Sequence, residues 1–222
     1  MELQYRSVVR VVVLTVMALL ALSLSGCGLR GTQASSAYPT ATPKPVGGKS
    51  VKTIYFAGGC FWGTQKYFDY IHGVTATEVG YANGASNSAT YGDGSGYAET
   101  VRVDYDPAVA PVPFLLRMFY KAIDPTTADR QGNDVGTEYR SGIYYTDPAD
   151  LPIIKASLAK LQTQLSAPVA IETGPLKTYT RAEDYHQKYL QKNPGGYCHI
   201  PLVSFKDAAS ARPEPSDFPA AK

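Results

Sequence analysis

The chain has 222 residues, a length that fits one folded domain with shorter segments attached to it. Hydrophobic residues make up 44% of the chain and charged residues 18%, which is enough apolar side chain for a conventional packed core. The formal net charge is only +2, and no run of basic residues alternates with aromatic ones. A nucleic-acid partner is therefore not expected, because such partners require a basic surface.

The N-terminal segment has the features of an export signal. Arg6 and Arg10 precede an uncharged run over 11–24, which is short for a transmembrane helix and suits the apolar region of a secretory signal. The run ends in Leu-Ser-Gly before Cys27, which resembles the lipobox of bacterial lipoproteins. The resemblance implies that residues 1–26 are a lipoprotein signal peptide and that Cys27 is lipidated. The alternative is an ordinary signal peptide followed by an incidental cysteine.

Two segments are expected to lie outside the folded body. Residues 27–50 are rich in Thr, Ser, Ala, Gly and Pro and contain almost no large apolar side chain, which predicts a disordered tether. Residues 207–222 contain three prolines and several alanines, and we expect a disordered tail there as well. The folded domain is therefore predicted to span 51–206, tethered outside the cytoplasm to a bacterial membrane by lipid on Cys27.

Within this body, short strands and helices alternate. Apolar periodicity and turn residues predict strands at 51–57, 75–81, 98–105, 142–145 and 169–173, and helices at 61–70, 113–123, 147–165 and 181–193. The segment 82–97 is packed with Gly, Ser and Asn, which predicts a surface loop long enough to have a function. The pattern favours an α+β two-layer sandwich with helices packed on a mixed or antiparallel sheet.

The chain contains three cysteines, Cys27, Cys60 and Cys198. If Cys27 carries lipid, the other two are the only thiols of an exported domain. In an oxidising compartment such a pair forms either a structural disulfide or a redox-active one. The residues around each cysteine decide between these alternatives.

Cys60 follows Gly58 and Gly59 at the expected start of a helix. A helix N-terminus favours an anion, so we expect the pKa of this thiol to be lowered. Phe61 and Trp62 supply an apolar wall beside the sulfur. A nucleophilic sulfur next to an apolar slot suits the reduction of a methyl sulfoxide, although these residues alone fit a buried structural cysteine equally well.

The residues Gly-Cys-Phe-Trp-Gly at 59–63 resemble the signature of the A-type peptide methionine sulfoxide reductases. Further matches follow in the order of that family, at 80–81, 98–99, 130–134, 136–141, 184–187 and 193–198. The resemblance covers 51 to about 203. It implies a ferredoxin-like α+β fold and an oxidoreductase that repairs proteins damaged by oxidative stress.

The resemblance also implies a role for each matching residue. The implied residues are Cys60 as nucleophile, Cys198 as resolving cysteine, Phe61 and Trp62 around the substrate methyl group, Glu99, Tyr91 and Tyr139 as donors to the sulfoxide oxygen, and Asp134 as a supporting acid. The family's usual His before Ala98 is here Tyr97, and the 82–97 loop is shorter than usual, so the rim of the pocket is expected to differ. We expect His186 and His199 to be structural and His72 to lie on the surface.

The implied reaction reduces the S epimer of methionine sulfoxide, free or in oxidised proteins and peptides. Cys60 becomes a sulfenic acid, Cys198 converts it to a disulfide, and a thioredoxin-like dithiol reduces that disulfide. No prosthetic cofactor is expected, and three scattered histidines without a Cys-x-x-Cys pair predict no metal site. A monomer is expected.

Two other interpretations use the same cysteines. One is a thiol peroxidase or thiol–disulfide oxidoreductase, in which peroxide or a disulfide oxidises Cys60. The other is a non-catalytic lipoprotein that is stabilised by a Cys60–Cys198 bridge.

Overall fold

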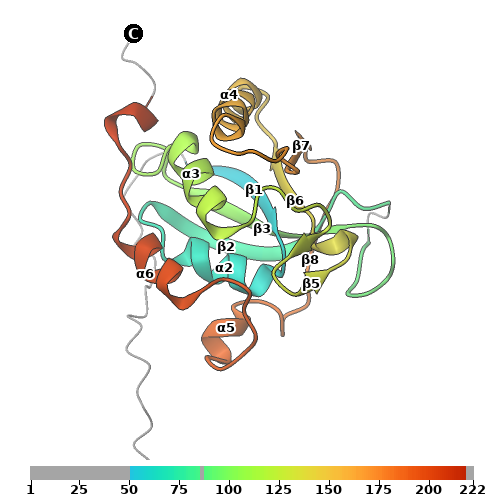
Figure 1. Cartoon of the computed structure of the whole chain (residues 1–222). Coiled ribbons are helices and arrows are strands. Elements are labelled where there is room, and N and C mark those ends of the chain that lie inside the picture. Colours follow the sequence, from blue (N-terminus) through green and yellow to red (C-terminus); the bar gives the residue numbers. More distant parts are fainter. Residues whose placement is uncertain (1–50, 86–87, 219–222) are drawn as a thin grey trace, which may run out of the picture. The chain divides into compact units, whose positions relative to one another are not determined.

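The structure is a computed structural model that describes residues 51–85 and 88–218 (Figure 1). The predicted signal peptide, the lipidation site Cys27 and the tether up to residue 50 lie outside the described residues. Within those residues, no helix has both the length and the apolar character that crossing a bilayer requires.

Six strands form one mixed sheet in the order β7-β6-β1-β3-β2-β8. The β6–β7 pair is parallel and the other neighbouring pairs are antiparallel. A separate two-stranded ribbon joins β4 and β5. The strands are β1 (Lys52–Gly58), β2 (Val74–Ala82), β3 (Ala98–Tyr105), β4 (Arg130–Gln131), β5 (Asp134–Val135), β6 (Ser141–Tyr145), β7 (Glu172–Pro175) and β8 (Tyr179–Arg181).

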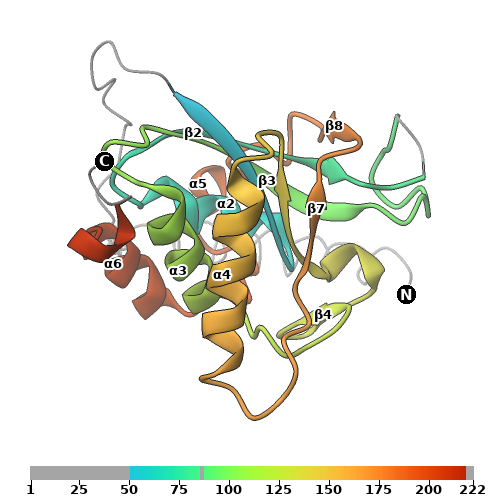
Figure 2. The same ribbon diagram turned by 90° about the horizontal axis from the view of Figure 1, so that it is seen from above.

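Helices pack on one face of this sheet. Phe56 of β1 stacks on Phe68 with ring centroids 4.7 Å apart and lies 4.9 Å from Phe119, which places two helices over the same strand. Figure 2 shows α3 and α4 side by side on this face. The helices are α2 (Phe61–Asp69), α3 (Val112–Ala122), α4 (Asp150–Gln162), α5 (Tyr189–Lys192) and α6 (Leu202–Ser210), with single 3₁₀ turns η1 (Thr137–Tyr139) and η2 (Pro215–Asp217).

Side chains that alternate along β1 supply an apolar cluster on each face of the sheet. Ile54 and Phe56 belong to the main core beneath the helices, whereas Tyr55 belongs to a smaller cluster with Tyr144 and Tyr179. Successive side chains of a strand point to opposite faces, so one strand supplies both clusters. The predicted α+β architecture, a mixed sheet with packed helices, is confirmed.

The predicted helix at 181–193 is wrong over most of its length. Residues up to Arg181 form β8, a strand that the residue pattern did not predict, and within this range helix is present only in α5. Lys188 adopts a left-handed conformation with φ of 54°, and its N–H donates to the Gln65 side chain at 2.7 Å. Such tertiary hydrogen bonds override the local helical pattern.

The predicted disordered tail also needs correction for residues 207–218. Helix α6 continues to Ser210 and buries Phe205 and Ala208 in the core. Farther along, the carboxylate of Asp217 accepts a hydrogen bond from Arg117 at 2.7 Å and is nearly buried. The folded domain therefore extends beyond 206.

Candidate active site

Cys60 lies at the junction of β1 and α2, as its flanking glycines predicted. It is the N-cap residue of α2 and is only 6% exposed. Gly59 has φ of +73°, and a Cβ there would lie 2.5 Å from the Cβ of Gln131. Gln131 belongs to the β4–β5 ribbon. Glycine is therefore required where the chain turns from β1 into α2 beneath that ribbon. The Thr64 hydroxyl donates to the Gly58 carbonyl at 2.9 Å and ties the turn to the helix.

The pKa of Cys60 is raised far above its usual value, contrary to the prediction. Burial is the largest cause, and the negative charge of Glu99 adds to it. The N–H groups of Trp62 and Gly63 act in the opposite direction but do not compensate. Desolvation thus outweighs the helix terminus, and the substrate-free site holds a neutral thiol.

Glu99 projects from β3 beside Cys60 and is 2% exposed. The Phe61 N–H donates to its Oε2 at 2.9 Å, which ties the carboxyl to the first residue of α2. Burial raises the pKa of Glu99 from its usual 4.5 to about 8, against this hydrogen bond, and the charges of Asp134 and Glu138 contribute. A carboxyl with this pKa is mostly protonated at pH 7 and can donate a proton.

Tyr139, at the end of η1, and Tyr91, from the 83–97 loop, lie at the same site. Burial is the first cause that raises the pKa of each phenol, and the charges of Glu99 and Cys60 contribute to both. A hydrogen bond with Tyr139 lowers the pKa of Tyr91 in part. The fold therefore brings both tyrosines to Glu99 and Cys60, although Tyr91 remains 53% exposed.

Two contacts hold the loop that carries Tyr91. The Gly92 N–H donates to the Tyr97 hydroxyl at 2.8 Å, and Tyr97 is buried against Tyr81 with centroids 4.5 Å apart. Glu183 accepts from the Tyr91 N–H at 3.3 Å and from the Tyr81 hydroxyl at 2.7 Å. The sequence analysis did not identify Glu183 as a site residue. The one sequence feature that could have indicated it is its position directly before the 184–187 motif.

Phe61 and Trp62 form an aromatic cluster with His186. Trp62 stacks on Tyr189 with centroids 3.8 Å apart, and its Nε1 donates to His186 Nδ1 at 2.9 Å. Burial lowers the pKa of His186, which keeps Nδ1 free of a proton and able to accept. His186 therefore orients the indole, a specific task within the structural role expected of it.

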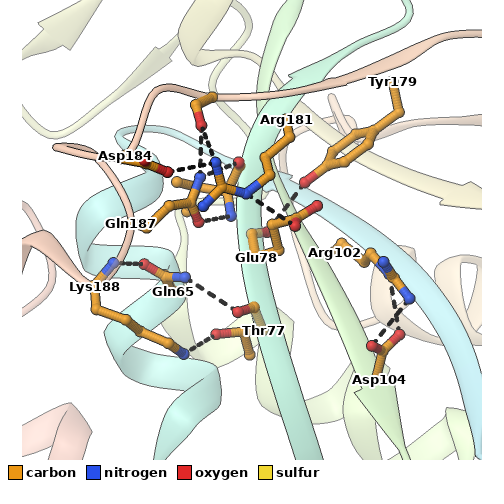
Figure 3. A network of polar contacts seen from close by, with 12 residues as sticks. Gln65, Thr77, Glu78, Arg102, Asp104, Tyr179, Arg181, Asp184, Gln187 and Lys188 are labelled. Atoms are coloured by element: carbon orange, nitrogen blue, oxygen red, sulfur yellow. Dashed lines mark hydrogen bonds and ion pairs between the residues drawn. The ribbon is translucent and has the colours of Figure 1, made fainter.

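Polar side chains clamp the segment that carries His186 onto β2 and α2 (Figure 3). The Gln187 amide accepts from the Val79 N–H at 3.0 Å and donates to the Val79 carbonyl at 2.9 Å. Lys188 Nζ forms an ion pair with Asp69, which is largely buried. These contacts hold the segment before α5 in place although it is not helical. They therefore fix the position of the aromatic cluster around His186.

Cys198 lies beside the first turn of α2. A Cβ on Gly63 would lie 2.8 Å from its Sγ, so the thiol occupies the space that this glycine leaves open. Cys60 and Cys198 are both free thiols, and burial is the main cause that raises the pKa of Cys198. The fold thus brings together two cysteines that are far apart in sequence.

Asp134 lies on β5 and contacts the segment around Cys198. Its Oδ2 lies 3.8 Å from Nδ1 of His199, and a hydrogen bond with Tyr197 partly offsets the rise in its pKa that burial causes. Among residues 51–85 and 88–218, no three His, Cys, Asp or Glu side chains are grouped so that they could hold a metal ion.

The fold and the site are those of a thiol-dependent reductase. The site contains a buried cysteine, a protonated carboxyl beside it and a second thiol. The model of the family "Peptide methionine sulfoxide reductase" matches residues 52–216. The chain belongs to the peptide methionine sulfoxide reductase family.

Curated relatives and solved structures agree. Peptide methionine sulfoxide reductase MsrA of Lachnoclostridium phytofermentans is 52% identical over 164 residues, covering 72% of this chain and 99% of that protein. The enzyme of the same name from Clostridium acetobutylicum is 50% identical over 160 residues, covering 70% and 99%. Mxr1 from Saccharomyces cerevisiae in reduced form has a TM-score of 0.64 and 36% identity, covering 68% of this chain and 92% of that one. Methionine sulfoxide reductase A of Corynebacterium diphtheriae has a TM-score of 0.60 and 37% identity, covering 71% and 84%.

Proposed function

We propose that this enzyme reduces the S epimer of methionine sulfoxide, free or in proteins, with Cys60 as the nucleophile. The observation that carries the proposal is the Glu99 carboxyl, which is buried beside Cys60 and has a pKa of about 8. The oxygen of a sulfoxide gains negative charge when a thiol attacks the sulfur of the sulfoxide. A buried acid that keeps its proton at neutral pH can donate that proton to this oxygen.

In the first half-reaction, Cys60 Sγ attacks the sulfoxide sulfur while Phe61 and Trp62 enclose its methyl group. Glu99 donates its proton to the oxygen, with Tyr91 and Tyr139 as further donors and Asp134 as a supporting acid. The oxygen passes to Cys60 as a sulfenic acid and methionine leaves. The proton released by the Cys60 thiol restores Glu99. Since the pKa of Cys60 is raised, this proton transfer accompanies the attack and does not precede it.

In the second half-reaction, Cys198 attacks the sulfenic sulfur to form the Cys60–Cys198 disulfide and water. A thioredoxin-like dithiol then reduces this disulfide by exchange, and no prosthetic cofactor is involved. The position of Cys198 Sγ against Gly63 supports the resolving role, because it places the thiol at the turn that begins with Cys60.

The place of action is also part of the proposal. The pattern before Cys27 supports a lipoprotein outside the cytoplasm, anchored to a bacterial membrane through the lipidated cysteine. A monomer is proposed as well. When the full chain is expressed in a bacterium grown with radiolabelled palmitate, the wild-type protein is expected to carry the label and Cys27→Ser is not. A wild-type protein without label would refute lipidation as the anchor.

The reaction is tested with separated S and R epimers of a methionine sulfoxide peptide and dithiothreitol as reductant. Wild type is expected to convert the S epimer alone, and Cys60→Ser is expected to convert neither. Cys27→Ser is the matched control and should keep full activity, because Cys27 precedes the segment that matches the family. Turnover of hydrogen peroxide without turnover of either epimer would favour a thiol peroxidase instead.

A further inference from the structure

His199 directly follows Cys198, and its ring lies against the turn that holds Cys60. A Cβ on Gly59 would lie 3.2 Å from the Cε1 of this imidazole, and one on Gly63 would lie 3.6 Å from both Cε1 and Nδ1. These two glycines flank Cys60 in sequence. The same point on Gly63 lies 2.8 Å from Cys198 Sγ, so the ring and the second thiol share one small space.

The imidazole is buried and has unused capacity for a proton. Its side chain is 3% exposed, and the Gly58 carbonyl accepts a hydrogen bond from one ring nitrogen. The other ring nitrogen has no partner within the part of the chain that the structure describes. Burial lowers the pKa of His199 to about 4, so the ring is neutral at physiological pH. A buried polar atom without a partner is costly, and such an atom calls for an explanation.

The second half-reaction requires a group of this kind. Burial raises the pKa of Cys198, so this thiol carries its proton at neutral pH, whereas the attacking species in disulfide formation is the thiolate. We propose that His199 accepts the proton of Cys198 as its sulfur attacks the sulfenic acid of Cys60. This inference rests on the proposed function and adds a proton acceptor to its resolving step.

The resolving step replaces one S–H bond and one S–O bond with an S–S bond and an O–H bond of water. The S–H bond of Cys198 breaks, its proton moves to the imidazole, and a bond forms between the two sulfurs. The S–O bond of the sulfenic acid breaks, and the departing hydroxide takes the proton from the imidazolium and leaves as water. The sulfur of Cys198 is oxidised and that of Cys60 is reduced. Asp134, 3.8 Å from Nδ1, stabilises the transient imidazolium.

The two half-reactions separate in a single-turnover experiment without reductant. Wild type and His199→Asn are mixed with excess S-sulfoxide peptide and quenched at successive times. Methionine is quantified by chromatography, and the Cys60–Cys198 disulfide by mass spectrometry of the alkylated protein. The variant is expected to form one equivalent of methionine at the wild-type rate but the disulfide about 100-fold more slowly. His72→Asn, at an exposed position, should match wild type in both phases.

A second measurement uses the wild type and does not depend on how the variant folds. The titratable groups that lie against the imidazole are Cys198 and Asp134. Because His199 is neutral above a pKa of about 4, the rate of disulfide formation should stay nearly constant between pH 6 and 8. Without a base, this rate should rise about tenfold per pH unit with the thiolate fraction.

A tenfold rise per pH unit in wild type, or a variant that forms the disulfide at the wild-type rate, would overturn the role of His199. Failure of wild type to form methionine from the S epimer would instead overturn the proposed function. The two failures appear in different products and are therefore distinguishable.

Discussion

Replacing Glu99 with glutamine is expected to remove most of the activity while stabilising the fold. With a pKa of about 8 in the folded protein, roughly ten Glu99 carboxyls are protonated at pH 7 for each one that is ionised. Glutamine keeps the size of this side chain and a polar group opposite the Phe61 N–H, but it has no proton to transfer. We therefore expect kcat to fall by about 10²- to 10⁴-fold.

The stability effect has the opposite sign. The folded-state pKa of Glu99 is raised, so its carboxyl stabilises the fold most below the unfolded-state pKa near 4.5, and this contribution is lost as the pH rises towards 8. Each pH unit in this window corresponds to about 1.4 kcal/mol, which amounts to about 3 kcal/mol by pH 7. Glutamine carries no charge in either state. The stability advantage of the variant should therefore grow from pH 4.5 to 8 and then level off.

Urea unfolding of both proteins at pH 5 and pH 8 tests the second effect, and initial rates on the S epimer between pH 6 and 9 test the first. The wild-type rate should decline as the pH rises through about 8, because Glu99 loses its proton there. Asp207→Asn, at an exposed carboxylate of α6, is the control and should change neither result. The reasoning fails if the wild-type rate increases through pH 8, or if Glu99→Gln retains wild-type turnover.

Three further substitutions have expected outcomes. Cys198→Ser should produce one equivalent of methionine and then stop with thioredoxin as reductant; sustained turnover at the wild-type rate would exclude the resolving role. Gly63→Ala should favour the helix by up to about 1 kcal/mol. It should also slow disulfide formation, because the new Cβ would lie 2.8 Å from Cys198 Sγ, and an unchanged disulfide rate in quenched-flow experiments would contradict this. Gln187→Ala should lower the free energy of unfolding by about 1–3 kcal/mol, since both backbone groups of Val79 lose a partner; superimposable urea curves would show that the clamp contributes nothing.

Local steric rules explain which parts of this protein can be predicted from its sequence. The strand ending at Gly58, the turn at Gly59 and the helix beginning at Phe61 depend on backbone conformations that neighbouring residues impose. The family resemblance likewise rests on short runs of residues around Cys60, Glu99 and Cys198. For this reason the fold class and the enzyme family followed from the sequence and are confirmed.

The remaining features depend on residues that are distant in the chain. A helical pattern at 181–193 predicted a helix, but the Gln65 side chain, 123 positions away, binds the Lys188 N–H and favours another conformation. The contact between the Tyr91 loop and Glu183 has no sequence signal, because 92 residues separate the two partners. Hydrogen bonds of this kind exist only after the sheet has formed.

The protonation states of Cys60 and Glu99 also depend on the tertiary structure. A helix N-terminus predicted a lowered pKa for Cys60, yet burial and Glu99 raise it. The sequence by itself determined the order of the strand, turn and helix that present this cysteine, and the set of residues available for chemistry. Only the tertiary structure decided which of these residues lose their contact with water, and with it whether Cys60 and Glu99 hold their protons, because desolvation depends on every chain segment packed around a group.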